Sequence, residues 1–199
     1  MSSPAPRVIV FAGPNGAGET THAEHILREL GIPTFVNADF IVRGLSGRHA
    51  DAVAFEAGRI MLRRLQQLAA AGQDFGFEAT LSSRSFGPFL RRLRALGYRV
   101  AIYFFWLRDA GLAVRRVRMR VRLGGHDVPS DVVRRRYARS LTNLLTIYLP
   151  LADAWTVFDN SGREESHLIA SHNQGQTHVR NEDLWKKLSQ KVRSNPEAC

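Results

Sequence analysis

One stretch near the start of the chain has residue types and spacing that could bind phosphate. Residues 13–20 read Gly-Pro-Asn-Gly-Ala-Gly-Glu-Thr and match the pattern G-x-x-x-x-G-K-S/T at every fixed position except Glu19. In such a loop, successive backbone N–H groups surround a phosphate, and the following helix N-terminus adds positive potential. The lysine of the pattern reaches the β- and γ-phosphates, and the hydroxyl residue holds Mg²⁺. Glu19 therefore places a carboxylate where an ammonium group is expected.

The flanking sequence favours a phosphate loop over an ordinary glycine-rich turn. Residues 7–12 form an apolar run of strand length, and residues 20–30 are predicted to form a helix that ends before Gly31. Strand, loop and helix in this order are what phosphate binding requires. The expected nucleotide contacts are Gly13, Pro14, Asn15, Gly16, Ala17, Gly18, Thr20 and Thr21, with Thr20 also the expected Mg²⁺ ligand.

We expect Glu19 to reduce catalytic turnover, because its charge repels a phosphate and burial strengthens that repulsion. The expected loss is at least about 10²- to 10³-fold, comparable to removing one preorganised charge-stabilising group. The lysines of the chain, Lys186, Lys187 and Lys191, all stand in the last predicted helix, so an arginine is the better candidate for a substitute cation. Glu19 is either an engineered or selected inactivating change or the mark of a natural pseudoenzyme.

Composition predicts one α/β domain with a full hydrophobic core, since 44% of the 199 residues are hydrophobic. No apolar run is long enough to cross a bilayer, and the first residues lack the apolar centre of a signal peptide. Cys199 is the single cysteine, which excludes a disulfide framework and favours a reducing cytoplasm. We expect one domain over residues 1–193 and a frayed tail over residues 194–199.

The net charge of +10 raises nucleic acid as a partner. The arginines, however, concentrate between Arg108 and Arg139, which indicates a local feature. A segment that clamps phosphates and a solvated helix face both explain this charge more simply than nucleic-acid binding.

Alternating strand and helix patterns predict a mostly parallel sheet with helices on both faces. Further strands are expected at 33–37, 74–77, 98–107, 153–158 and 167–170. Further helices are expected between Asp51 and Gly72, at 85–96, at 110–123, from Ser130 onward and at 182–192, with a polar loop before the last. The predicted fold is a three-layer P-loop kinase fold with five or six strands and an arginine-rich helical lid over about residues 110–136.

Two further strands end in side chains suited to phosphoryl transfer. Ligands of parallel sheets bind beyond the carboxyl ends of the strands, where Asn37 and Asp39 follow one strand and Glu78 follows another. We expect Asp39 to accept the proton of an acceptor hydroxyl, and Glu78 to hydrogen-bond the acceptor or a metal-bound water. Asn37 is an expected acceptor contact. The alternative makes Asp39 a helix N-cap, which leaves Glu78 unexplained. The other expected acceptor contacts are Thr80, Ser82 and Arg84.

The segment 115–136 has the composition of a lid over a polyphosphate. On a helix Arg116 and Arg120 share one face, and like charges at this spacing destabilise the helix unless an anion binds. His126 stands at the tip beside two glycines, and Arg135 follows near the start of the next helix, where positive charge is unfavourable. The alternative is two solvated arginine faces.

Residues 159–162 read Asp-Asn-Ser-Gly after a predicted strand. They form either a simple tight turn or, through Asn160, a contact beside the nucleotide base.

With these features in place, the chain resembles the zeta-toxin-like P-loop kinases, in particular the compact bacterial group often labelled predicted ABC-type ATPases. The resemblance covers about the first five-sixths of the chain and is loose after Gly162. The matching stretches are GPNGAGETT (13–21), FVNADFI (35–41), AFEAGRIML (54–62), FEATLSSRS (77–85), GYRVAIYFFWL (97–107), RRVRMRVRLGGHDVP (115–129), RRRYARSLTNL (134–144) and LADAWTVFDNSG (151–162).

The resemblance implies an ATP- and Mg²⁺-dependent kinase with an alcohol group as acceptor. In zeta toxins the acceptor is a nucleotide sugar, UDP-N-acetylglucosamine, and the usual partner is a small helical antitoxin. By motif, Asp39 matches the catalytic base, Glu78 and Thr80 match acceptor contacts, and Arg116 matches a phosphate-binding lid arginine.

Two positions depart from the family pattern. The family carries lysine at the position of Glu19, and His126 stands near where a second lid arginine is expected. The leading hypothesis is a small-molecule kinase of the zeta-toxin type that Glu19 inactivates. The alternatives are a non-catalytic nucleotide- or antitoxin-binding module, and a phosphotransferase acting on nucleic acid, whose binding would weaken steeply with salt.

Overall fold

A computed structural model describes residues 4–44, 50–125, 127–162 and 166–193 of the chain. The strands in these residues are β1 (Arg7–Ala12), β2 (Phe35–Val36), β3 (Phe75–Ala79), β4 (Arg99–Trp106), β5 (Ala154–Asp159), β6 (His167–Asn173) and β7 (Gln176–Val179). The helices are α1 (Glu19–Glu29), α2 (Ala38–Gly44), α3 (Ala50–Ala70), α4 (Phe86–Ala95), α5 (Ala110–Arg122), α6 (Ser130–Asn143) and α7 (Glu182–Arg193). Two shorter turns follow α6: the π-helical η1 (Leu144–Tyr148) and the 3₁₀ turn η2 (Leu149–Leu151).

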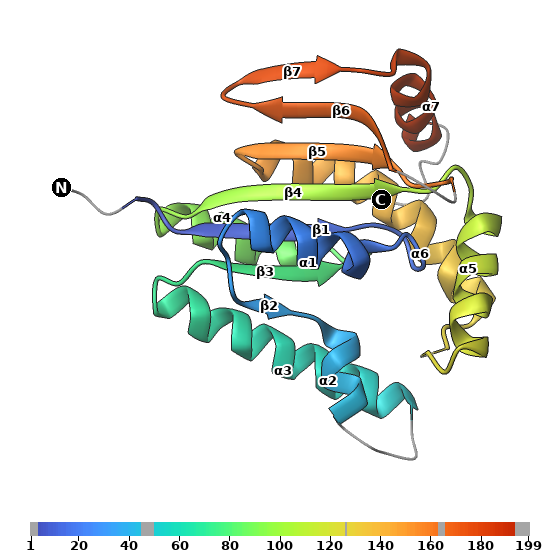
Figure 1. Ribbon diagram of the computed structural model, residues 1–199, viewed down its shortest axis with the longest axis horizontal. Helices are drawn as coiled ribbons and strands as arrows, with labels where there is room; N and C mark the ends of the chain where they lie inside the picture. Colours follow the sequence, from blue (N-terminus) through green and yellow to red (C-terminus); the bar gives the residue numbers. More distant parts are fainter. Residues whose placement is uncertain (1–3, 45–49, 126, 163–165, 194–199) are drawn as a thin grey trace.

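The strands form one sheet in the order β2-β3-β1-β4-β5-β6-β7, with helices on both of its faces (Figure 1). The pairs from β2 to β5 are parallel, as expected for strands joined by helical crossovers. β1 and β4 lie at the centre and are almost entirely apolar, because helices cover them on both sides. The predicted α/β fold with a mostly parallel sheet is therefore confirmed.

Strand register places the functional loops at one edge of the sheet. Ala12 at the end of β1 pairs with Ala79 at the end of β3 and with Phe104 near the end of β4. Val36 at the end of β2 pairs with Phe77. The loops that follow β1, β2 and β3 consequently leave the sheet side by side, and α5 lies beyond this edge (Figure 1).

The sheet has more strands than the sequence predicts. The segment between β6 and α7 was expected to be a polar loop. It instead contains β7, which pairs with β6 as an antiparallel hairpin. The hairpin turns at Gln174 and Gly175, whose φ angles are 51° and 77°. Every residue of β7 is exposed, so no alternation of apolar and polar residues marks it in the sequence.

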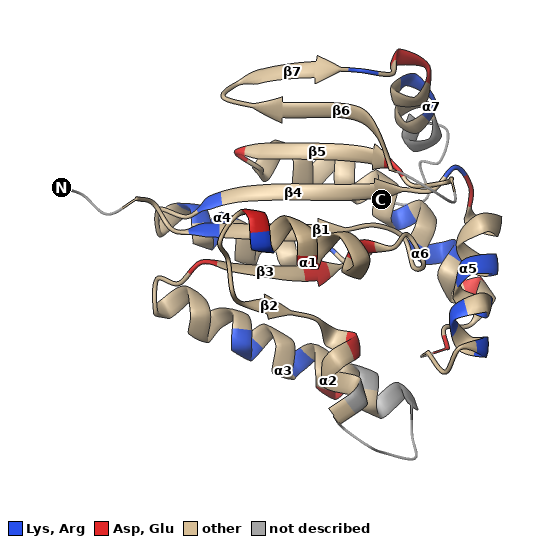
Figure 2. Ribbon diagram, viewed as in Figure 1, with Lys and Arg blue, Asp and Glu red and all other residues tan. Residues whose placement is uncertain are grey.

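Charge is distributed unevenly over the fold. Figure 2 shows arginines gathered on α5 and α6, at the end of the molecule toward which the parallel strands run. Acidic residues occur on α1, on α2 and at the end of β3, on the other side of the same opening (Figure 2). Among the described residues, no helix has both the length and the apolar character needed to span a membrane.

Candidate active site

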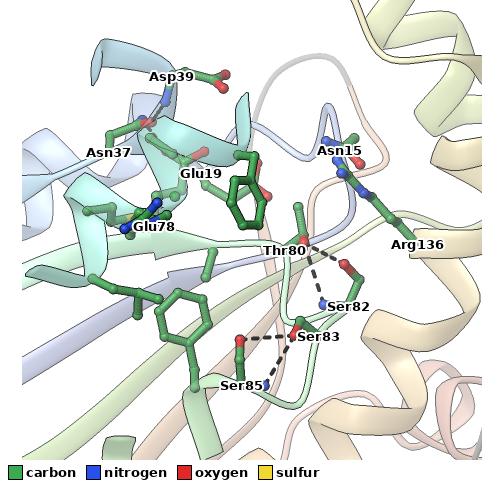
Figure 3. A pocket seen from close by; sticks show the side chains of 18 of the residues that line it. Asn15, Glu19, Asn37, Asp39, Glu78, Thr80, Ser82, Ser83, Ser85 and Arg136 are labelled. Atoms are coloured by element: carbon green, nitrogen blue, oxygen red, sulfur yellow. Dashed lines mark hydrogen bonds between the residues drawn. The ribbon is translucent and has the colours of Figure 1, made fainter. Parts of the chain in front are cut away.

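The loops after β1, β2 and β3 surround a cavity of about 590 Å³, together with residues of α3, α5 and α6 (Figure 3). A cavity of this size suits a small-molecule ligand. Most of the acidic and hydroxyl residues predicted for the site line it. The predicted residues on its wall are Asn15, Gly16, Glu19, Asn37, Asp39, Glu78, Thr80, Ser82 and Arg120.

The loop between β1 and α1 has the backbone of a phosphate loop. Gly16 and Gly18 adopt φ angles of 81° and 89°, which favour glycine. The amide of Ala17 donates to the carbonyl of Pro14 at 2.9 Å. A Cβ at Gly13 would come within 2.6 Å of the Phe105 carbonyl oxygen, so a side chain there would force the loop away from β4.

Asn160 braces this loop from the end of β5. Its side-chain amide donates to the carbonyl of Ala17 at 2.5 Å, and its oxygen accepts from Ser166 at 2.8 Å. A Cβ at Gly18 would lie 2.9 Å from the Asn160 amide nitrogen, so the contact needs glycine there. Asn160 therefore has a structural role, and its predicted place beside a nucleotide base stays a prediction.

Glu78 holds together the residues at the floor of the cavity. Its Oε2 accepts from the Thr20 hydroxyl at 2.6 Å and from the Asn37 amide at 2.8 Å. Asn37 is only 4% exposed and also accepts from the backbone amide of Asp39 at 2.7 Å. Asn37 thus caps α2. Little of its side chain is exposed for contact with an acceptor, so that contact stays a prediction.

Asp39 does not cap α2, which was the alternative to a catalytic role, because Asn37 caps this helix. The Asp39 carboxylate instead lies 3.3 Å from the guanidinium of Arg120 and is 40% exposed. This ion pair joins α2 to α5 across the mouth of the cavity. A half-exposed carboxylate in this place can accept a proton from a bound hydroxyl.

Glu19 begins α1 and is only 6% exposed. Burial, reinforced by the nearby Glu78 charge, raises its pKa to about 8, while backbone hydrogen bonds of Glu19 and Gly18 and the charge of Arg120 act in the opposite direction. Burial also raises the pKa of Glu78, against the hydrogen bond from Thr20. Glu19 therefore holds its proton to a higher pH than a solvent-exposed glutamate does. Protonation would weaken the charge repulsion that the sequence leads us to expect.

The lid arginines divide into those that reach the cavity and those that do not. Arg120 and Arg136 line the cavity, from α5 and α6. Arg116 instead donates to the carbonyl of Gly162 at 2.6 Å and packs over the phosphate loop, with its Cβ 3.1 Å from a Cβ built on Gly16. Arg135 is exposed and does not line the cavity.

Two other predicted residues do not line the cavity. Arg84 and Thr21 are exposed and absent from the cavity wall. His126 lies outside the described residues. Arg135 was predicted to contact the acceptor, but its neighbour Arg136 lines the cavity. Arg136 stands three residues after the buried Val133, so both lie on the inward face of α6.

A set of buried polar side chains that the sequence prediction missed holds the loop after β3. From α6, Ser140 donates to the carbonyl of Thr80, and Asn143 donates to that of Leu81 at 2.8 Å. The Tyr148 hydroxyl at the end of η1 donates to the carbonyl of Ser83. Leu81 has a φ of 53°, uncommon for a bulky residue, so these bonds hold a strained backbone.

The held loop presents hydroxyl groups to the cavity. The Thr80 and Ser82 hydroxyls hydrogen-bond each other at 2.8 Å, and Ser83 and Ser85 do so at 2.9 Å (Figure 3). Hydroxyls can both donate and accept, so this wall suits a polar acceptor. The hydrogen-bonding side chains on α6 could have been found as polar residues on the face that carries Val133 and Tyr137.

The donor set around Thr20 fits a hard cation only in part. Thr20 and Glu78 supply the oxygen ligands that Mg²⁺ prefers. Among the described residues, however, no three carboxylate, imidazole or thiol groups are arranged to hold a metal by themselves. A Mg²⁺ ion would thus rely on phosphate and water oxygens in addition to Thr20, as is usual for this ion.

Comparison with known proteins agrees with this geometry. Residues 8–144, from β1 through α6, match the sequence model of a family described as an AAA domain. The chain belongs to this AAA-domain family. The matched AAA domain contains the phosphate loop, most of the cavity wall and the arginine-rich helices α5 and α6.

The relatives of this AAA domain are distant in sequence. An uncharacterized protein of Haemophilus influenzae is 22% identical over 131 residues, which cover 66% of this chain and 92% of the relative. The native AvrRxo1-ORF1:-ORF2 complex contains a chain with a TM-score of 0.75 and 18% identity, covering 93% of this chain. This chain spans only 64% of that AvrRxo1 chain, which has also been solved with ATP.

The PezAT toxin–antitoxin system of Streptococcus pneumoniae contains a second similar structure. Its TM-score is 0.61 at 13% identity, and the match covers 98% of this chain and 88% of the other. At these identities both likenesses show a shared fold.

Proposed function

We propose that this AAA domain is a kinase that transfers the γ-phosphoryl group of ATP to a hydroxyl group of a small molecule. The observation that carries the proposal is the single cavity shared by three kinds of group. The cavity is lined by residues of the phosphate loop, by Asp39, and by Arg120 and Arg136. Phosphoryl transfer needs little more than such positioning and charge.

Each group has a defined part in the transfer. The acceptor oxygen forms a bond to the γ-phosphorus, the bond between that phosphorus and the β–γ bridging oxygen breaks, and ADP leaves. Asp39 takes the proton of the acceptor hydroxyl. Arg120 and Arg136 stabilise negative charge on the moving phosphoryl group. Mg²⁺, held in part by Thr20, would offset the charge of the ATP phosphates.

For the acceptor we propose a UDP-amino sugar such as UDP-N-acetylglucosamine. This assignment rests on the resemblance of the Asp39, Glu78 and Thr80 motifs to those of zeta toxins. The hydroxyl-rich wall of the cavity and the nearby guanidinium of Arg136 are compatible with a sugar that carries phosphate. A small antitoxin protein is the corresponding proposed partner, since the PezAT structure is that of a toxin–antitoxin system.

Glu19 favours a second candidate function, a nucleotide-binding module without catalysis. A buried carboxyl group in place of the phosphate-loop lysine removes the cation that the transferred phosphate needs. In this case the cavity binds a nucleotide or a protein partner and turns nothing over.

A screen of the Glu19→Lys variant distinguishes the two candidates. We expect this variant, supplied with ATP, Mg²⁺ and UDP-N-acetylglucosamine or a mixture of metabolites, to add phosphate to one compound, detected by mass spectrometry. Asp39→Asn in the same background should abolish the transfer. Nucleotide binding without any phosphorylated product would favour the non-catalytic module. Absence of nucleotide binding would refute the kinase and the nucleotide-binding form of the module.

A further inference from the structure

The side chain of Glu19 folds back into the phosphate loop that precedes it. Its Oε1 atom lies 3.0 Å from the position that a Cβ on Gly13 would take, at the opposite end of the loop. The backbone of Glu19 and of Gly18 acts to lower the pKa of the same carboxyl group, against the larger effect of burial. With 6% of the residue exposed, the carboxyl group is buried between the loop and the cavity rather than directed to solvent.

This is the position in which a phosphate loop binds its ligand. The amides at the start of α1 lack partners within the helix and converge on an anion. A carboxyl group resembles a phosphate in presenting oxygens that accept hydrogen bonds from such amides. An oxygen of Glu19 and an oxygen of a nucleotide phosphate therefore compete for the same donors.

We propose that Glu19 is an internal ligand of the phosphate loop, which a nucleotide must displace before its phosphates can bind. The proposal rests on the proposed nucleotide binding and adds a mode of regulation to that site. It differs from loss of the lysine charge alone, because the carboxyl group itself takes up space inside the loop. The cost of emptying the loop lowers the apparent affinity for every phosphate ligand by the same factor.

The surroundings of Glu19 offer a place for the displaced side chain. Arg120 lines the same cavity and its charge favours the ionised form of Glu19. On the other side, Glu78 already accepts two hydrogen bonds, from Thr20 and Asn37, and repels a second carboxylate. Displacement is therefore expected toward the lid, where Glu19 and Asp39 would share Arg120.

Occupancy and charge predict different affinities for a set of variants at one fixed pH. Glu19→Gln keeps a side chain whose oxygen can still accept from the loop amides, whereas Glu19→Ala leaves the loop empty. The affinity for Mg²⁺-ADP is measured by calorimetry. We expect Glu19→Ala to bind Mg²⁺-ADP at least about tenfold more tightly than the wild type does. This factor corresponds to a wild-type loop that is free of the Glu19 side chain about one-tenth of the time or less. Glu19→Gln should fall between the two.

The matched control is Glu24→Gln, which makes the same change at an exposed position of the same helix and should bind as the wild type does. Equal affinities for Glu19→Ala and Glu19→Gln would overturn the proposal in favour of charge alone. Equal affinities for Glu19→Ala and the wild type would also overturn it.

A second measurement decides the proposal without any nucleotide. Amide hydrogen exchange at Gly18 and Glu19 should be slow in the ligand-free wild type and in Glu19→Gln, and faster in Glu19→Ala. Unchanged exchange in Glu19→Ala would show that the carboxyl group does not occupy the loop. If neither Glu19→Lys nor Glu19→Ala binds Mg²⁺-ADP, the proposed nucleotide function fails, and the exchange rates still decide whether Glu19 fills the loop.

Discussion

Glu19 and Glu78 are two carboxyl groups that share a buried space beneath the phosphate loop. Their pKa values are raised mainly by burial, and the charge of Glu78 contributes at Glu19. Water is the better solvent for a carboxylate, so each group retains its proton more strongly in the folded chain than in the unfolded one. Burial in this site consequently favours the protonated form of both carboxyl groups.

This pair gives stability a pH dependence of known sign. The Glu19 pKa is about 8 in the folded chain and near 4.5 when unfolded, so its contribution to stability is fully present below pH 4.5 and is lost as the pH rises toward 8. We expect the melting temperature to fall between pH 5 and pH 9, and Glu19→Gln to reduce that fall. Thermal unfolding across this range tests it, with Glu24→Gln as control, and an unchanged slope in Glu19→Gln would contradict it.

Arg135 and Arg136 form a natural matched pair on α6. Arg136 lines the cavity, where burial lowers its pKa and Asp39 opposes the change, whereas Arg135 is exposed. In the Glu19→Lys background, Arg136→Gln should lower phosphate transfer by about 10- to 100-fold, as expected for loss of one charge-stabilising group. Arg135→Gln should change it less than about twofold. Equal effects of both variants would remove Arg136 from the site.

At the scale of elements, α6 and η1 carry the loop after β3. Ser140, Asn143 and Tyr148 are buried, and each donates to a backbone carbonyl of that loop. The same helix carries Arg136 on the cavity wall, so one rigid element positions both a cation and the acceptor loop. The π-helical turn of η1 lies where these bonds are made, in keeping with the frequent occurrence of such turns at functional sites.

Removing one of these bonds should loosen the loop. Asn143→Leu leaves the Leu81 carbonyl without its donor and should lower the free energy of unfolding by about 1–3 kcal/mol. Amide exchange should rise in residues 80–85 more than in β1 or β4. Thr146→Val is the control, because the Thr146 hydroxyl in η1 donates to the carbonyl of Thr142 in α6 rather than to the loop after β3. Uniform acceleration of exchange throughout the sheet would indicate a global rather than a local effect.

At the scale of the whole molecule, the sequence was most informative where structure is local. The strand, loop and helix around residues 7–30 follow one another, so apolar runs, glycines and helix ends predict them directly. β7 was not predicted, because all of its residues are exposed and its sequence does not alternate between apolar and polar residues. The assignment of Arg135 in place of Arg136 shows the same limit, since one residue of helical rotation decides which side chain enters the cavity.

The remaining differences come from contacts between distant residues. The capping of α2 by Asn37 could not be separated from capping by Asp39 without the backbone of the turn. The raised pKa of Glu19 comes mainly from burial in the folded chain and then from the charge of Glu78, which lies in β3. The bonds from α6 to the loop after β3 join residues about sixty positions apart, for which spacing in the sequence gives no signal.

We propose that the phosphate loop and the cavity beside it form a phosphotransferase site in which Glu19 replaces the lysine of the phosphate-loop pattern. Its most direct test is Mg²⁺-ATP turnover by the wild type and by Glu19→Lys, measured side by side as ADP release with the acceptor identified in the screen. Restoring the lysine should raise turnover by at least about 10²-fold. Equal turnover in the two proteins, with both correctly folded, would contradict the claim.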